Sequence, residues 1–201
     1  MWKPLLVICL AFSLPVAAQV KVLALSGSTR QDSYNQKLVT EAAQIASQMG
    51  AAVTVINLRD YPLPFFDEDV EAKEGIPAKG KELRQLMAQS QLIIIASPEY
   101  NASLSAVLKN TIDWASRDDA QGNPSPAFKG KKFLIMSASP GGGGGKRGIV
   151  HLRAILTGIG GNVLPNELTV PNAFNAFDAQ GHLKDPAMKQ QLQKLVQSAL
   201  Q

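Results

Sequence analysis

Residues 92–101 read LIIIASPEYN, and this stretch decides how the chain folds. Its first five residues form an uninterrupted apolar run, which is short for a helix and has no polar side to face water. Such a run is typical of a strand that is buried on both faces of a parallel sheet. The polar turn that begins at Ser97 marks the end of the strand. The stretch therefore predicts a central strand with a polar loop at its carboxyl end.

The same arrangement recurs along the chain and predicts five strands that alternate with helices. Further apolar or alternating runs indicate strands over 20–25, 52–57, 133–136 and 162–170. Apolar residues at helical spacing predict helices over 35–49, 79–90, 104–112, 149–159 and 188–200. Prolines and mixed charge indicate loops over 58–78 and 117–131. The pattern predicts an α/β three-layer sandwich whose five-stranded parallel sheet has the order 2-1-3-4-5.

The first eighteen residues differ from the rest of the chain. Lys3 gives a positive start, an apolar run covers 5–14, and small residues lead up to Ala18. This three-part pattern is typical of a secretory signal cleaved after Ala18, and the apolar run is too short for a stable membrane anchor. We therefore expect a signal segment over 1–18, one domain over 19–201, and export to the periplasm or the medium. A cloned extension or an added strand, on a cytoplasmic protein, is the alternative.

The composition excludes several classes of function. Cys9 is the only cysteine and lies in the expected signal segment, so disulfides, thiolate catalysis and cysteine-ligated iron–sulfur clusters are not expected in the mature chain. Two histidines without a cysteine make a metal site unexpected as well. Aromatic residues make up only 6% of the chain and the lysines are scattered, which argues against nucleic-acid binding despite a net charge of +4.

Three polar turns are expected to meet at one edge of the sheet, because the carboxyl ends of parallel strands lie together. These turns read SGSTR over 26–30, SPEYN over 97–101 and SASPG over 137–141. The strand order reverses between the first and third strands, which is where open parallel sheets bind ligands. Turns of this polarity are not needed to build a sheet. Their coincidence is therefore the main functional signal of the sequence.

The first turn suits a phosphate group. Ser28 and Ser33 offer hydroxyls, and Arg30 offers a guanidinium fork. The helix that starts near Asn35 directs its free N–H groups and its dipole to the same place. Ser33 and Gln36 also have the spacing of a capping box, so a plain helix cap is the alternative for Ser33. A Walker loop is absent, as is a G-x-G-x-x-G fingerprint after the first strand, which indicates a mononucleotide-type loop.

The other two turns suit a flat ring. In the second turn, Pro98 stiffens the backbone, Tyr100 offers an aromatic surface and Asn101 offers both a donor and an acceptor. In the third turn, five consecutive glycines over 141–145 let the backbone approach a flat ligand closely. Taken alone, the glycine run is almost equally consistent with simple flexibility, and the second turn with an ordinary loop.

Together these motifs resemble the NADPH-dependent FMN reductase family, in particular its quinone and chromate reductase branch. The matching pieces are GSTR at 27–30 with Ser33 and Asn35, PEYN at 98–101, LKN at 108–110, DW at 113–114, the glycine-rich turn, and HLR at 151–153. The resemblance runs from about Val20 to the C-terminus and implies a flavodoxin-like fold. It also implies non-covalent FMN, NADPH or NADH as co-substrate, and hydride transfer through the bound flavin to a small acceptor such as a quinone, chromate or free flavin.

The resemblance further implies which residues bind the cofactor. The FMN phosphate would be held by Ser28, Arg30, Ser33 and Asn35. The ring and ribityl chain would be lined by Pro98, Glu99, Tyr100 and Asn101. The other side would be closed by Ser137, Ser139 and Gly141. No side chain is expected to act as a general acid or base, because the cofactor carries out the chemistry.

The resemblance implies a homodimer or a homotetramer as well. Asp113, Trp114 and Arg117 match family positions near a subunit interface. Because Trp114 lies on the apolar stripe of a predicted helix, packing inside the chain is the alternative for this residue.

Two other functions could use the same fold. A flavodoxin-like electron carrier would bind FMN without turning over nicotinamide, but such carriers are usually acidic and this chain is slightly basic. A non-enzymatic binding protein would use the fold without flavin. We therefore expect an enzyme. If it is exported, its electrons must come from a donor other than cytosolic NADPH, or it must fold with its flavin before export.

Overall fold

The computed structural model describes residues 19–118 and 125–201. The expected signal segment lies outside these ranges, as does part of the predicted connection over 117–131. In chain order the elements are β1 (Lys21–Ser26), α1 (Tyr34–Gln48), β2 (Ala52–Asn57), the 3-10 helix η1 (Leu58–Asp60), α2 (Glu68–Glu74), α3 (Ala78–Gln89), β3 (Leu92–Ala96), β4 (Glu99–Tyr100), β5 (Ser103–Leu104), α4 (Ala106–Ala115), β6 (Lys132–Ala138), α5 (Lys146–Gly158), β7 (Asn162–Val163), β8 (Leu168–Val170), α6 (Ala173–Ala176) and α7 (Pro186–Leu200). Within the described ranges, every helix is too short or too polar to cross a membrane.

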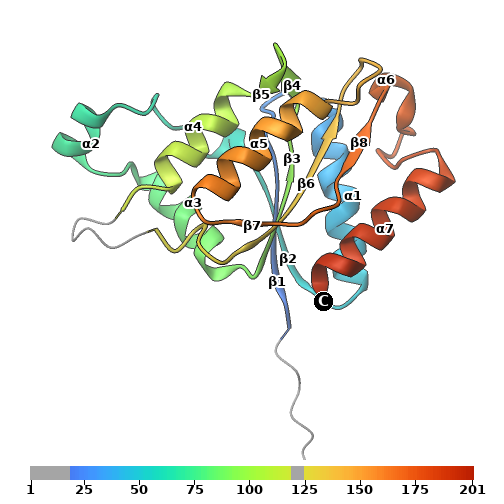
Figure 1. Ribbon diagram of the computed structural model, residues 1–201, viewed down its shortest axis with the longest axis horizontal. Coiled ribbons are helices and arrows are strands. Elements are labelled where there is room, and N and C mark those ends of the chain that lie inside the picture. The colour runs from blue at the N-terminus through green and yellow to red at the C-terminus, as the bar shows by residue number, and fades with distance from the viewer. Residues whose placement is uncertain (1–18, 119–124) are drawn as a thin grey trace, which may run out of the picture.

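The main sheet is parallel and has the predicted strand order (Figure 1). β2, β1, β3 and β6 lie side by side in that sequence, and β7 and β8 share the fifth position beside β6. Ser26 of β1 is in register with Ala96 of β3, and Ala96 is in register with Met136 of β6. The three strands thus reach the same level. The turns that follow them therefore begin at one edge of the sheet, as predicted.

Helices cover both faces of the sheet (Figure 1). α1 and α7 pack on one face, and α3, α4 and α5 pack on the other. In β3, Leu92 and Ile94 belong to the first of the two resulting cores, whereas Ile93 and Ile95 belong to the second. All four side chains are buried. A strand with a core on each side leaves no place for a polar residue, which explains the unbroken apolar run.

The predicted fifth strand over 162–170 is divided into β7 and β8. Pro165 has no backbone N–H to contribute to a ladder. The Arg153 guanidinium donates to the carbonyl of Leu164 at 2.7 Å and to that of Pro165 at 3.4 Å. It also pairs with the Glu167 carboxylate at 2.6 Å. The position of the strand in the sheet was predicted correctly, but its division was not, because the Arg153 contacts at the break come from a different element, α5.

The segment 58–78 is not the plain loop that its prolines predict, since it contains η1 and α2. The Asp67 carboxylate starts α2 by accepting the N–H groups of Asp69 at 2.8 Å and Val70 at 3.2 Å. α2 buries none of its residues. The loop prediction failed because a helix without a buried face has no apolar stripe in its sequence.

Trp114 packs inside the chain. Its side chain is fully buried, its ring N–H donates to the Pro64 carbonyl at 2.8 Å, and its ring meets that of Phe66 edge-on with 5.0 Å between centroids. These contacts agree with the packing alternative and leave no surface of Trp114 for a partner subunit. The neighbouring Asp113 pairs with Lys109 at 2.7 Å on the exposed side of α4.

Candidate functional site

The first turn is organised by its own serine hydroxyls. The Ser26 Oγ accepts the N–H of Ser28, and the Ser28 Oγ accepts the N–H of Arg30, both at 3.2 Å. The Ser33 Oγ accepts the N–H of Gln36 at 3.3 Å and so caps α1. Ser28 and Ser33 are only 4% and 3% exposed. Because a hydroxyl that accepts can still donate, each retains a proton for an anion in the turn.

Only half of the predicted capping box is formed. The Ser33 cap is present, but among the described residues the side-chain carbonyl of Gln36 is buried without a hydrogen-bond partner. Gln36 lines a small cleft together with Gln180 and His182. Ser33 is therefore a helix cap, and its hydroxyl can still donate its proton to a ligand.

Asn35 connects the first turn to the third. Its side-chain Nδ2 donates to the carbonyl of Ala138 at 2.9 Å, and its Oδ1 accepts the N–H of the same residue at 2.8 Å. The side chain is buried. The amide thereby imitates a strand neighbour at the end of β6 and fixes the start of α1 there. Its backbone N–H, in the first turn of α1, has no partner within the helix.

The second turn forms a two-residue hairpin between β4 and β5. Asn101 and Ala102 occupy its tip with φ of 49° and 67°, as in a type I′ turn. Pro98 is buried at the base, and Tyr100 is 51% exposed. Asn101 is also exposed, at the tip of the hairpin. The hairpin thus presents an aromatic surface beside the sheet edge.

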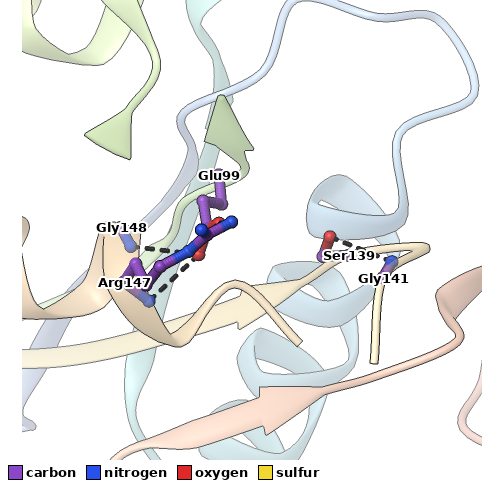
Figure 2. Close-up of polar contacts among 5 residues, drawn as sticks. All are labelled: Glu99, Ser139, Gly141, Arg147 and Gly148. Carbon is purple, nitrogen blue, oxygen red and sulfur yellow. Dashed lines mark hydrogen bonds and ion pairs between the residues drawn. The ribbon is translucent and has the colours of Figure 1, made fainter. Parts of the chain in front are cut away.

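Glu99 points its carboxylate at the start of α5 (Figure 2). One carboxylate oxygen accepts the backbone N–H groups of Arg147 at 3.0 Å and Gly148 at 3.3 Å. The other accepts the Arg147 Nε at 2.8 Å. Burial alone would raise the pKa of the Glu99 carboxyl, but the hydrogen bonds from Arg147 and Gly148 outweigh it and hold that pKa below its ordinary value. Glu99 therefore joins the second turn to the start of α5 as a carboxylate.

The third turn needs two of its five glycines for steric reasons. Gly144 and Gly145 have φ of +61° and +89°. A side-chain carbon on Gly145 would lie 1.8 Å from the Ser137 Oγ, and one on Gly144 would lie 3.0 Å from the backbone of Pro171. The alternative of simple flexibility does not account for these two positions. The Ser139 Oγ accepts the N–H of Gly141 at 3.3 Å and closes the start of the turn (Figure 2).

Two adjoining cavities lie between the three turns. The smaller, about 50 Å³, is bounded by the first and second turns and by the residues that end β6. The larger, about 580 Å³, is bounded by the glycine run, Lys146, Arg147 and Val150. Glu99 and Ser139 line both, so the cavities adjoin at these residues.

Most of the predicted cofactor-binding residues line these cavities. The smaller cavity contains Ser28, Arg30, Ser33, Asn35, Pro98, Glu99, Tyr100 and Ser139. Gly141 lines the larger one. Asn101 and Ser137 line neither cavity. Ser137 is fully buried beneath the third turn, and its Oγ has no hydrogen-bond partner among the described residues.

Three further residues shape the site although no motif contains them. Ser105 caps α4, and its Oγ donates to the carbonyl of Gly27 at 2.5 Å. Its position just before an apolar helical stripe is a signal that could have identified the cap. Arg59 contacts the first turn and Arg147 the second. Nothing local in the sequence indicates either contact.

The two ends of the site differ in chemistry. At the first turn, hydroxyls, N–H groups at the start of α1 and the exposed Arg30 favour an anion. The acidic Asp32 there is paired with Lys37 at 2.6 Å, which neutralises its charge. At the third turn, bare glycine backbone and the nearby Tyr100 suit a flat ring. Together the residues fit a ligand with an anionic end and a planar end, as FMN has.

Comparison with known proteins gives a consistent result. The family model described as NADPH-dependent FMN reductase matches residues 20–175. An NAD(P)H-dependent FMN reductase of Pseudomonas aeruginosa is 37% identical over 180 residues, covering 89% of this chain and 92% of the relative. An NADPH:quinone oxidoreductase of Arabidopsis thaliana is 34% identical over 182 residues, covering 89% of each chain.

A solved structure has the same fold over nearly the whole chain. FerB of Paracoccus denitrificans, described as a flavoenzyme NAD(P)H:(acceptor) oxidoreductase, superimposes with a TM-score of 0.73 at 26% identity. The match covers 90% of this chain and 95% of FerB.

Proposed function

Because the chain belongs to the NADPH-dependent FMN reductase family, whose members are oxidoreductases that use FMN and NAD(P)H, we propose that it binds FMN and transfers electrons from NADPH or NADH to a quinone. One observation carries the proposal. The anion-binding first turn and the glycine-lined cavity adjoin at the carboxyl ends of β1, β3 and β6.

In this proposal the phosphate of FMN lies at the first turn. Ser28 and Ser33 donate their hydroxyl protons, and Arg30 supplies the opposing charge. Asn35 contributes its backbone N–H and the second N–H of its Nδ2, because Oδ1 and the first N–H of Nδ2 already pair with Ala138.

The ring of FMN lies between the second and third turns. Tyr100 and Pro98 supply apolar surface on one side, and the backbone around Ser139 and Gly141 supplies the other. Glu99 lines both cavities, whereas Ser137 lines neither and lies buried beneath the third turn. Glu99 fixes the hairpin to α5, and Ser137 lies under Gly145. Asn101 shapes the hairpin turn through its positive φ.

Bound FMN supplies the hydride chemistry, and the protein supplies position and electrostatics. The residues that line the cavities include no histidine, so no neutral-pH acid or base is assigned. Lys146 gives the rim of the larger cavity a positive charge, since the charge of Arg147 is paired with Glu99, and this favours anionic groups of the nicotinamide co-substrate. A quinone is the preferred acceptor because it is flat and fits the same open cavity. Chromate and free flavin remain further candidates.

The proposal is tested by flavin spectroscopy. The purified protein is saturated with FMN, freed of excess ligand, and treated anaerobically with NADPH and then with benzoquinone. We expect the flavin absorbance bands to bleach with NADPH and to return with the quinone. Bands that persist with NADPH but bleach with dithionite would instead identify an electron carrier. Protein that retains no flavin would contradict the proposal altogether.

We also propose a homodimer or homotetramer, because the family resemblance suggests one. Trp114 does not contribute to this argument, since its side chain is buried inside the chain. Light scattering coupled to gel filtration measures the mass directly. A monomer mass near 21.5 kDa or slightly below would contradict this part of the proposal.

A further inference from the structure

Arg59 reaches from the turn after β2 to the first turn of the site. The Nε of its guanidinium donates to the carbonyl of Thr29 at 3.1 Å, and one terminal nitrogen donates to the same oxygen at a shorter distance. Arg59 itself stands in η1, where its backbone N–H donates to the Asn57 side chain at 2.9 Å. Two donors of one planar group thus converge on a single carbonyl.

This contact fixes one peptide unit at both ends. The carbonyl of Thr29 is held by Arg59, and the N–H of the next residue, Arg30, donates to the Ser28 Oγ at 3.2 Å. A peptide plane held at its oxygen and at its N–H cannot rotate without losing a hydrogen bond. The direction in which Arg30 leaves the backbone is therefore set by Arg59 together with Ser28.

The contact also keeps a carbonyl oxygen away from an anion. Neither Thr29 nor Arg59 lines the two cavities, and the carbonyl of Thr29 is engaged by the Arg59 guanidinium. An unrestrained carbonyl in this small, polar turn could rotate toward the cleft and repel a phosphate. Earlier in the turn, Gly27 is fixed by other contacts, since its N–H donates to the Ala96 carbonyl at 2.8 Å and its own carbonyl accepts from the Ser105 hydroxyl.

We infer that Arg59 is a positioning residue that fixes the Thr29 peptide and thereby makes the site prefer a 5′-phosphorylated flavin over riboflavin. The inference rests on the proposed function, because it takes FMN as the ligand. Its physical basis is preorganisation: a turn that is already in its binding conformation loses less conformational entropy when it binds the phosphate. Riboflavin lacks the phosphate and gains little from an ordered first turn.

The test compares the affinities of FMN and riboflavin in three variants and the parent protein. Arg59→Ala removes the contact, and Arg59→Lys keeps the charge but lacks the planar fork. Arg84→Ala is the matched control, since Arg84 lies on α3, lines neither cavity and has no ion pair among the described residues. Quenching of flavin fluorescence gives each Kd, and circular dichroism checks that each variant is folded.

We expect Arg59→Ala to raise the Kd of FMN about tenfold and that of riboflavin by less than about twofold, as loss of a charged hydrogen-bonding contact predicts. Arg59→Lys should lose most of the same preference. Arg84→Ala should match the parent protein.

Several results would overturn the inference. Equal weakening of both ligands by Arg59→Ala would indicate a general structural role. Parental FMN binding by Arg59→Lys, or a loss by Arg84→Ala as large as that by Arg59→Ala, would show that charge alone matters. If the parent binds FMN and Arg59→Ala binds it equally well, only this inference fails. If the parent protein binds neither flavin, the proposed function fails with it.

Discussion

At the scale of single residues, the polar side chains of the site are used largely to hold backbone. Ser28, Ser33, Asn35 and Glu99 each bond to main-chain groups of the turns or helices around them. Each such bond uses a donor or acceptor that could otherwise bind a ligand, but it keeps the remaining donors in place. A site built in this way binds by preorganisation more than by the number of its side-chain ligands.

Ser105 provides a first test at this scale. Its hydroxyl caps α4 through the N–H of Leu108 and holds the carbonyl of Gly27, and its side chain is buried. Ser105→Ala should therefore lower the free energy of unfolding by about 1–2 kcal/mol, because the Leu108 N–H loses its cap and the Gly27 carbonyl loses its donor. Urea denaturation measures this. The exposed Ser198→Ala is the control, and equal effects of the two substitutions would contradict the assignment.

Glu99 predicts a specific dependence of stability on pH. Because the folded state holds the pKa of Glu99 below its ordinary value, the carboxylate stabilises the fold above that ordinary value. The contribution is lost as the pH falls from the ordinary value through the lowered one. Acidification from about pH 6 to about pH 3 should thus cost the parent protein more unfolding free energy than it costs Glu99→Gln. Parallel pH profiles for the two proteins would rule this out.

At the scale of elements, the hairpin of β4 and β5 has a strained backbone at its turn. Its two-residue turn requires positive φ at both positions, and the second is Ala102 rather than the glycine that such turns prefer. An L-residue with a side-chain carbon is strained there. The hairpin is retained because Glu99, at its base, is bonded to α5.

Ala102→Gly should therefore stabilise the apoprotein. The relief of strain exceeds the entropy that glycine adds to the unfolded chain, and we expect a net gain of about 0.5 kcal/mol. Ala154→Gly, on the exposed side of α5, should instead cost about 1 kcal/mol, as glycine does in a helix interior. Thermal and urea denaturation of both variants checks the opposite signs. A loss of stability in both would refute the turn assignment.

At the scale of the whole molecule, two cores hold the sheet so that three strand ends lie level. The apolar periodicity of the sequence contains this information, which is why the layers, the strand order and the meeting of the three turns were predictable. The exposed helix α2 and the break between β7 and β8 were not. α2 has no buried face, and the break depends on Arg153, which lies on another element.

The first eighteen residues give a prediction at the same scale. When the full chain is expressed in a bacterium, we expect export and cleavage between Ala18 and Gln19, because the segment has the three parts of a secretory signal. The intact mass of protein from the periplasm or the medium locates the cleavage. A chain that starts at residue 19 with an added Met should stay in the cytoplasm. Full-length, uncleaved protein in the cytoplasm would contradict the prediction.

The layers and the order of the strands follow from the sequence alone, because burial on two faces and helical periodicity are local patterns, whereas the candidate site residues were named from the polar turns and the family resemblance. The tertiary structure alone decided what those residues bind. Asn35 pairs with Ala138, 103 residues away, and Glu99 with Arg147, 48 residues away. Arg59 meets Thr29 across 30 residues. A hydrogen bond depends on distance and direction in space, and neither is present in the spacing of residues along the chain.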